Sequence, residues 1–330
     1  MSEVKQTTGR PDLNGTVNVL KPPGMTSAEV VAYLRRLLKI KRVGHTGTLD
    51  PGVAGVLPVC TGQATRMAEY FTDQGKAYRV EVTFGIITDT QDAFGEVLTR
   101  QTAAITVEDV ERTLARFCGT VEQIPPMYSA VRQGGKHLYE YARQGVEIER
   151  QSRQVQITDI RLLDWQGGDY PRAVIEVQCS KGTYIRTLCH DIGQALGCGA
   201  HMSFLLRLRS GPFQLEHSWT LEEITTAVEN FDYSFLRPLP EGLELPLTNL
   251  PPVRGQAFLN GLSTKGHLVE GSLQSDGTIV QVCSAGSFLG IGVWRSGSLV
   301  PYKVLTRNNN KQESGVRSQN DGTGENIDDR

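Results

Sequence analysis

Helix-like and strand-like segments follow one another in this chain without the regular strand–helix–strand order that builds a parallel sheet. Alternating apolar residues predict strands, and a threonine followed three residues later by an acid predicts helix starts at Thr26 and Thr106. The pattern is that of an α+β fold with a mixed or antiparallel sheet. The predicted elements are a strand over Gly15–Leu20, a helix from Thr26, a strand over Tyr78–Ile86, a helix from Thr106, paired strands over Arg153–Trp165 and Arg172–Ser180, and a helix over Thr183–Leu196 that Gly197 ends.

The composition and pattern of the sequence change after residue 245. The prolines of Leu245-Pro246 and Leu250-Pro251-Pro252 predict a linker, and short strand-like runs separated by Gly, Ser and Asp then predict a small β-barrel or sandwich. Aromatic residues disappear after residue 306, which is typical of a disordered tail. The predicted organisation is a polar arm over 1–13, a main domain over 14–245, a small β-rich domain over 246–306 and a tail over 307–330.

Charge is segregated along the chain, although the net charge is only −2. Residues 20–66 hold seven lysines and arginines against two carboxylates, and residues 181–213 hold four against one. Residues 68–125 and 214–250 are net acidic. The basic blocks coincide with glycine-rich motifs, which favours a positive face for a polyanion over a chance clustering of solvated charges.

Membrane, secreted and metal-binding classes find little support in the sequence. No segment approaches the ~18 consecutive apolar residues of a membrane helix, and the first ten residues lack the apolar core of a targeting signal, so we expect a cytoplasmic protein. The six cysteines are scattered without a Cys-x-x-Cys pair. Neither Cys198 with His201 nor Cys189 with His190 has the spacing of a closed zinc site, so we expect reduced thiols and no metal.

The motif Gly44-His45-Thr46-Gly47-Thr48-Leu49-Asp50-Pro51 places an aspartate in a Gly/Thr-rich loop between basic segments. No second acid, Cys/His cluster or phosphate-binding motif lies near it in the sequence. This favours a carboxylate that forms a covalent bond or transfers a proton without a metal or cofactor. The alternative is an Asp-Pro pair that only initiates a turn.

An ordered set of motifs resembles the TruB family of tRNA pseudouridine synthases, which isomerise the T-arm uridine at position 55. The resemblance covers roughly residues 14–305. It implies a pseudouridine synthase catalytic domain, a C-terminal PUA-type RNA-binding barrel and an RNA-gripping insertion at about 124–153. The motifs that carry it are Lys21-Pro22-Pro23-Gly24-Met25-Thr26-Ser27, the Asp50 loop, Lys76-Ala77-Tyr78, Gly85-x-x-Thr88-Asp89-Thr90-x-Asp92, Pro125-Pro126-Met127-Tyr128-Ser129-Ala130 and Lys181-Gly182-Thr183-Tyr184-Ile185-Arg186.

The resemblance also implies roles for individual residues. Asp50 is the expected nucleophile or general base, Arg186 its ion-pair partner, and Tyr78 the ring that stacks on the extruded base. The purely structural alternatives are a surface ion pair for Arg186 and a core position for Tyr78. The expected substrate-binding residues are His45, which takes the space that the base vacates, Leu205 against the uracil, and Tyr184, Lys21, Arg132 and Lys136, with Lys21 favoured as a brace of the loop.

The sequence thus predicts a monomeric, cofactor-free enzyme that acts on the T-arm stem-loop of tRNA. One alternative is a non-catalytic RNA-folding chaperone with the same positive face. A second is an Asp-dependent glycosidase, which would ordinarily need two carboxylates.

Overall fold

The computed structural model describes residues 13–271 and 274–305. The chain divides after Pro246 into two compact units. The predicted N-terminal arm lies outside the described residues except for its last residue, and the predicted tail over 307–330 lies wholly outside them. None of the helices in the described ranges has the length and apolar character needed to span a bilayer.

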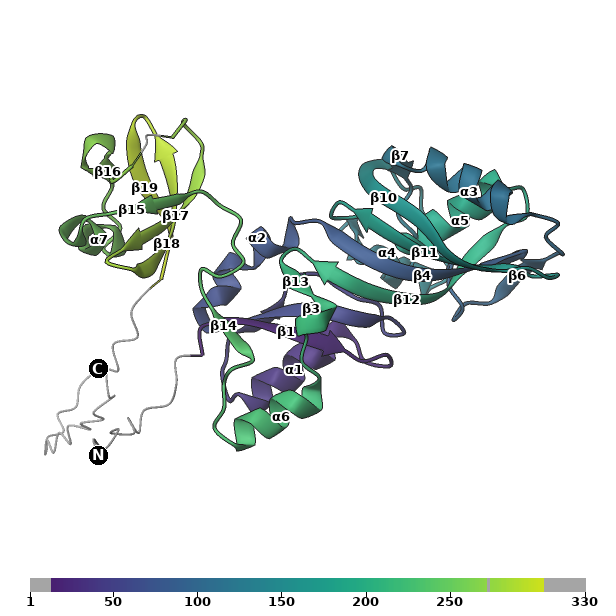
Figure 1. Ribbon diagram of the computed structural model, residues 1–330, viewed down its shortest axis with the longest axis horizontal. Coiled ribbons are helices and arrows are strands. Elements are labelled where there is room, and N and C mark those ends of the chain that lie inside the picture. The colour runs from purple at the N-terminus through teal and green to yellow at the C-terminus, as the bar shows by residue number, and fades with distance from the viewer. Residues whose placement is uncertain (1–12, 272–273, 306–330) are drawn as a thin grey trace, which may run out of the picture. The chain divides into compact units, whose positions relative to one another are not determined.

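The first unit is built on one large sheet whose neighbouring strands run in the order β14-β1-β3-β12-β4-β11-β10-β7, with β2 beside β3 and β13 beside β12 (Figure 1). The pairs are antiparallel except for β12 with β3, so the predicted α+β class with a mixed sheet is confirmed. The strands are β1 (Gly15–Lys21), β2 (Val43–His45), β3 (Ala54–Thr61), β4 (Lys76–Phe84), β7 (Gly119–Gln123), β10 (Arg153–Gln166), β11 (Arg172–Cys179), β12 (Ala200–Ser210), β13 (Phe213–Gln214) and β14 (Leu236–Pro238).

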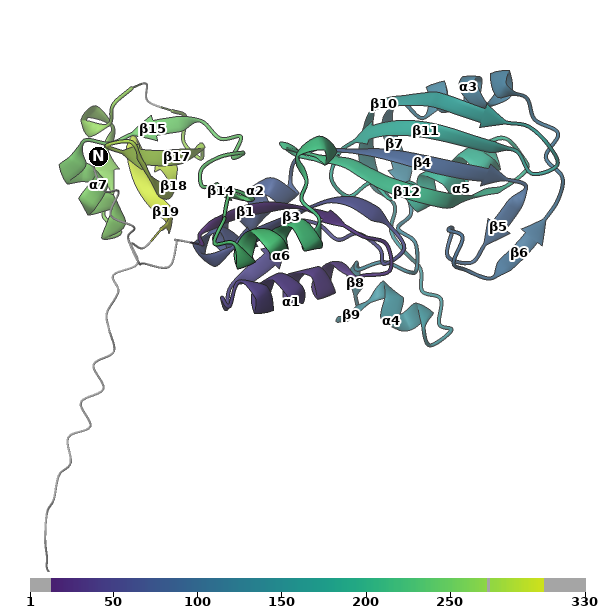
Figure 2. The same ribbon diagram turned by 60° about the horizontal axis from the view of Figure 1, so that its bottom comes forward.

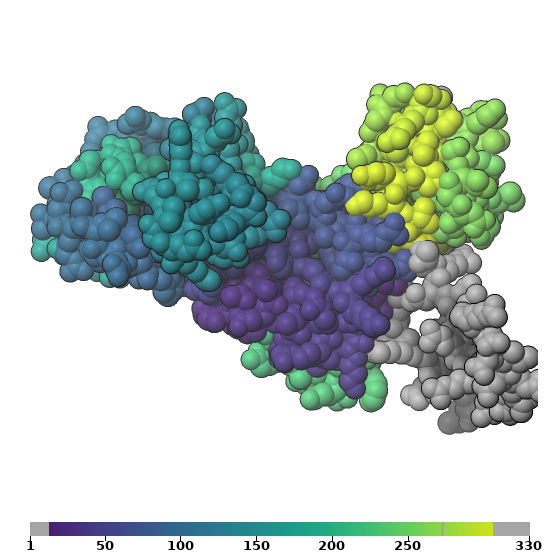
Figure 3. All heavy atoms as spheres, turned by 180° about the vertical axis from the view of Figure 1, so that it is seen from behind, coloured from purple at the N-terminus to yellow at the C-terminus, as the bar shows by residue number. Residues whose placement is uncertain are grey.

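Helices cover this sheet in two groups. The helices α1 and α6 lie side by side below β1 and β3 (Figure 1, Figure 2). The Tyr33 hydroxyl of α1 lies 2.6 Å from Thr225 Oγ1 of α6. Figure 3 shows the atoms of the two helices in contact from behind. The helices α3 and α5 contact each other, and they pack against β10 and β12 respectively (Figure 1). The helices of this unit are α1 (Ser27–Leu37), α2 (Ala68–Thr72), α3 (Val107–Arg116), α4 (Leu138–Ala142), α5 (Ile185–Ala195) and α6 (Leu221–Glu229), with 3₁₀ turns at Gly62–Met67 and Leu215–His217.

Local signals set the helix boundaries. Thr26 and Thr106 are the N-caps of α1 and α3, and each forms a complete capping box with the acid three residues later, as predicted. The third helix, α5, begins at Ile185 rather than Thr183 and is followed by Gly197 at φ +74°. The predicted hairpin of β10 and β11 is present as an antiparallel pair.

The predicted strand over Tyr78–Ile86 is interrupted at Gly85. Gly85 has φ +82°, and a Cβ atom there would lie 2.3 Å from the Gln101 carbonyl oxygen. The chain therefore leaves β4 at Phe84 and enters a separate two-stranded sheet of β5 (Ile86–Thr88) and β6 (Val97–Arg100). The insertion contains another small hairpin, β8 (Arg132–Gln133) and β9 (Lys136–His137), whose turn residues Gly134 and Gly135 both have positive φ.

The two halves of the large sheet meet where β3 runs parallel to β12, with Arg207 opposite Gly55. A Cβ atom at Gly55 would lie 2.3 Å from the Arg207 carbonyl oxygen, so only glycine allows the strands to approach this closely. The loop that carries Asp50 enters β3 at this junction. The fold therefore places the loop against the end of β12.

The second unit is a curled five-stranded sheet in the order β15-β17-β18-β19-β16 around Phe258, Trp294 and other buried apolar residues. The predicted linker is too long: Leu245-Pro246 lies outside helices and strands, but Leu247–Asn249 forms a strand and Pro252 opens a helix. Proline suits the first turn of a helix, where its missing N–H leaves no bond unmade. The elements are β15 (Leu247–Asn249), α7 (Pro252–Leu259), β16 (Thr264–Lys265), β17 (Ile279–Ser284), β18 (Ser287–Arg295) and β19 (Ser298–Val304), with a 3₁₀ turn at Gly266–Leu268.

Candidate active site

The loop that carries Asp50 is held from both sides by hydrogen bonds to its backbone. Ser27, the first residue of α1, accepts from the Leu49 N–H at 2.9 Å and donates to the Leu49 carbonyl at 3.1 Å. The Gly24 N–H donates to the Pro51 carbonyl at 2.8 Å. The residues on either side of Asp50 are thus fixed while its side chain, 44% exposed, is free to react.

Lys21 is part of this brace and does not face the cavities. It is fully buried, and its Nζ donates to the carbonyls of Pro22 at 2.8 Å, Met25 at 2.5 Å and Pro51 at 3.2 Å. Burial lowers the pKa of Lys21 to about 8, and the Asp50 carboxylate partly offsets this. The structure favours the bracing role over direct substrate binding.

Arg186, in the first turn of α5, forms an ion pair with Asp50 at 3.1 Å between Nη2 and Oδ2. The guanidinium is only 6% exposed and also donates to the carbonyls of Tyr128 at 2.7 Å and Thr90 at 3.1 Å. These contacts fix the planar fork, so Arg186 orients the carboxylate before any ligand arrives. The predicted partners are thus brought together.

A second carboxylate, that of Asp92, lies in the site, although no second acid lies near Asp50 in the sequence. Asp92 Oδ2 is 3.7 Å from Arg186 Nη1. However, Asp92 Oδ1 accepts hydrogen bonds from the Thr90 hydroxyl at 2.6 Å and the Phe94 N–H at 3.0 Å. Asp92 is therefore a fixed counter-charge for Arg186 rather than a second free acid.

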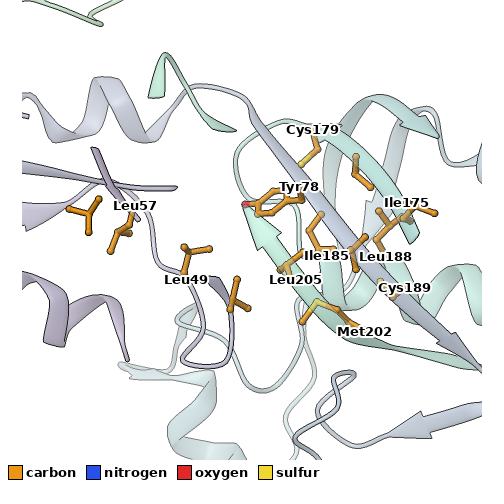
Figure 4. Close-up of a cluster of buried hydrophobic side chains, with 14 of the residues drawn as sticks. Leu49, Leu57, Tyr78, Ile175, Cys179, Ile185, Leu188, Cys189, Met202 and Leu205 are labelled. Carbon is orange, nitrogen blue, oxygen red and sulfur yellow. The ribbon is translucent and has the colours of Figure 1, made fainter. Parts of the chain in front are cut away.

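Asp50 borders two cavities, of about 280 Å³ and 690 Å³. The smaller has an apolar end formed by Tyr78 of β4 and Leu205 of β12, two predicted site residues on paired strands (Figure 4). Arg153, Lys181 and Lys76 add positive charge to the same walls. This cavity can hold a flat uncharged ring next to the carboxylate, with cations positioned for phosphate groups.

Tyr78 is 7% exposed and lies opposite Arg207 in the β4–β12 pair. Burial raises the pKa of the Tyr78 hydroxyl, and the adjacent Arg207 guanidinium, which donates a hydrogen bond to it, opposes this rise. Tyr78 is consequently a neutral phenol at physiological pH, with its hydroxyl available as a donor.

Arg207 and Lys76 also line the smaller cavity, although the sequence predicts no role for either. Arg207 is 1% exposed and donates to the carbonyls of Val56 at 2.7 Å, Gly47 at 3.3 Å and Thr48 at 3.5 Å. It therefore ties β12 to both the Asp50 loop and β3. In the sequence Arg207 is marked only by its place in a basic block, and Lys76 only by its place as the first residue of a motif.

Of the remaining predicted residues, one lines a cavity beside Asp50 and three do not. Tyr184 lines the smaller cavity, its backbone is held by both polar atoms of the Gln123 side chain, and the Arg153 guanidinium carbon lies 4.5 Å from its ring centroid. His45 ends β2, does not line either cavity and has its pKa lowered by burial. Arg132 and Lys136 lie on the exposed β8–β9 hairpin, away from the cavity walls.

Metal-binding side chains do not gather in the site. Among residues 13–271 and 274–305, no group of three His, Cys, Asp or Glu residues has the arrangement of a metal site.

Burial of Lys76 predicts a specific pH dependence of stability. Burial, followed by repulsion from Arg207, lowers the pKa of Lys76 from 10.5 to about 8. Between these values the unfolded chain binds a proton that the folded chain has released, so the free energy of unfolding rises with pH above about 8. Replacing Lys76 by methionine should flatten this rise in urea denaturation measured from about pH 8 to pH 9.5. Equal slopes for the two proteins would contradict the assignment.

Comparison with known proteins defines the class of this site. Two family models match consecutive parts of the chain, the N-terminal domain of the TruB family of pseudouridylate synthases over residues 35–185 and the C-terminal domain of tRNA pseudouridylate synthase B over residues 186–247. Both describe enzymes that convert uridine in RNA into pseudouridine. The chain belongs to the TruB family.

Relatives named tRNA pseudouridine synthase B support this assignment. The protein from Symbiobacterium thermophilum is 59% identical over 64% of this chain and 72% of its own length, and the one from Moorella thermoacetica is 51% identical over 76% and 84%. Among solved structures, a Cbf5-Nop10-Gar1 complex matches with a TM-score of 0.69 and 28% identity over 88% of this chain and 85% of the other. An archaeal box H/ACA Nop10-Cbf5 complex matches with a TM-score of 0.66 and 26% identity over 90% and 88%. The pseudouridine synthase fold therefore agrees with the family assignment.

Proposed function

We propose that this enzyme isomerises the uridine at position 55 in the T-loop of tRNA to pseudouridine. The observation that carries the proposal is the Asp50–Arg186 ion pair at the edge of a small cavity with an apolar end. The names of the curated relatives support tRNA as the substrate. The T-loop position rests on the motifs that resemble the TruB family.

The reaction is a rearrangement that conserves atoms and electrons. The bond between uracil N1 and ribose C1′ breaks, the detached base turns, and C5 forms a new bond to C1′. C5 then loses a proton and N1 gains one. Because nothing is oxidised or reduced, the chemistry requires no redox cofactor, and Asp50 supplies the group that each candidate route needs: attack on C1′, attack on C6 or removal of the 2′ proton.

The cavity supports an extruded base. Removing a base from its stack costs a few kcal/mol, and contacts in the cavity and in the vacated space recover part of this. Tyr78 and Leu205 would enclose the uracil, and Tyr184 and Arg153 would line the entrance. His45, on the neighbouring strand β2, would occupy the space that the base leaves.

Other parts of the chain would hold the rest of the RNA. We assign the insertion at 124–153 to gripping the T-arm, because Arg132 and Lys136 are exposed on its hairpin and Lys136 lies 5.8 Å from the ring centroid of Tyr141. We assign the unit after residue 246 to a PUA-like RNA-binding role. The proposed enzyme is a monomer without a metal, and its tRNA substrate places it in the cytoplasm.

A mapping experiment tests this function. The enzyme is incubated with an unmodified tRNA transcript and with the same transcript carrying cytidine at position 55, and pseudouridine is located by position. We expect pseudouridine at position 55 of the first RNA and none in the second. Binding of both RNAs without any pseudouridine would instead favour the non-catalytic RNA chaperone.

A further inference from the structure

One buried hydroxyl in the wall of the site has no partner. Ser129 is 5% exposed, and its Oγ makes no hydrogen bond to any residue that the structure describes. Its backbone N–H donates to the Met127 carbonyl at 2.9 Å, and its carbonyl accepts from the Tyr139 N–H at 3.1 Å. The backbone of Ser129 is therefore fixed while its hydroxyl is unused. Such a group destabilises the folded protein unless water or a ligand supplies the missing partner.

Ser129 also lies beside the proposed reacting pair. The preceding residue, Tyr128, holds Arg186 Nη2 at 2.7 Å, and the same nitrogen is 3.1 Å from Asp50 Oδ2. The two cavities share a short stretch of wall that includes Asp50, so a nucleotide in contact with Asp50 lies against it. This shared wall consists of Thr48, Asp50, Val53, Ser129, Ala130 and Arg186.

We propose that the Ser129 hydroxyl forms a hydrogen bond with the extruded uridine nucleotide and holds it against Asp50. This inference rests on the proposed function, because it takes that nucleotide as the occupant of the cavity. A serine hydroxyl both donates and accepts, and uridine offers carbonyl oxygens on its base and hydroxyl groups on its ribose. Rotation about the Cα–Cβ bond from one staggered rotamer to another redirects the hydroxyl without moving the backbone.

The test replaces Ser129 by alanine. We expect pseudouridine formation in a tRNA transcript to slow by about tenfold under single-turnover conditions, the size of one lost hydrogen bond to a buried group. The dissociation constant for tRNA should change by less than about twofold, because phosphate contacts over a wide surface dominate affinity. The melting temperature should not fall, because the mutation removes a hydroxyl that has no partner in the free enzyme.

Ser210→Ala is a matched control. Ser210 is 1% exposed and its Oγ is likewise without a partner among the described residues, but it lines neither cavity. We expect a wild-type rate for this variant, and substantial recovery of the rate in Ser129→Thr, which keeps the hydroxyl. A wild-type rate in Ser129→Ala, an equal loss in Ser210→Ala, or a rate loss accompanied by a lower melting temperature would overturn the proposal. A wild-type enzyme that binds tRNA but forms no pseudouridine overturns the proposed function, and this inference with it.

Discussion

Replacing Asp50 by asparagine is expected to lower the single-turnover rate of pseudouridine formation by at least about 10⁴-fold, the loss typical of removing an essential catalytic group. The amide matches the carboxylate in size but has no charge, so it forms no ester and accepts no proton. The loss of a negative charge should not weaken the binding of a polyanion. Rates are measured by rapid quench with excess enzyme, and tRNA affinity by filter binding.

The control for Asp50→Asn is Asp164→Asn. This change alters the net charge by the same amount at an exposed position on β10, and it should leave the rate unchanged. An Asp50→Asn enzyme within tenfold of the wild-type rate would remove Asp50 from the chemistry, whatever its effect on binding.

Replacing Arg207 by methionine is expected to lower the rate by about 100-fold, the cost of displacing a catalytic group by roughly 1 Å. Arg207 touches both the Asp50 loop and Tyr78, through the carbonyls of Gly47 and Thr48 and the phenol hydroxyl. Methionine fills a similar volume but donates no hydrogen bond, so the loop loses an anchor. The pKa of Tyr78 should also rise further, because the guanidinium that opposes the effect of burial is gone.

A suitable control for this change is Arg209→Met, two residues further along β12. Arg209 lines neither cavity, and its Nη1 donates to the Gly211 carbonyl at 3.4 Å. We expect this variant to keep the wild-type rate and the wild-type titration of Tyr78. Equal losses in the two variants would show that Arg207 acts through the general stability of β12 rather than through the loop.

Local sequence signals predicted much of the fold, because their physical causes are local. The caps at Thr26 and Thr106 and the hairpin of β10 with β11 depend on residues a few positions apart. The parallel contact of β3 with β12 joins residues about 150 positions apart and could not be predicted in this way. The part of the predicted linker after Pro246 was wrong because proline both ends strands and begins helices, and only packing against the second sheet decides between them.

The same distinction between local sequence signals and tertiary contacts applies to the candidate site. Asp50, Arg186 and Tyr78 belong to motifs that resemble a known family, so the sequence predicted them, and the structure places Asp50 against Arg186 and all three on one cavity. Asp92 and Ser129 also lie in such motifs, but the sequence gave them no role, and their place in the site, like that of Arg207, comes from tertiary contacts. A buried arginine that bonds only to carbonyls and a phenol, or a serine without a partner, has no signature in the order of residues.

The most direct test of the proposed function is a crystal structure of the Asp50→Asn enzyme bound to a T-arm stem-loop RNA. We expect the uridine at position 55 to be extruded into the smaller cavity, with its base between Tyr78 and Leu205 and its glycosidic bond beside residue 50. A T-loop bound with this uridine still stacked in the RNA, and with the cavity between Tyr78 and Leu205 empty, would contradict it.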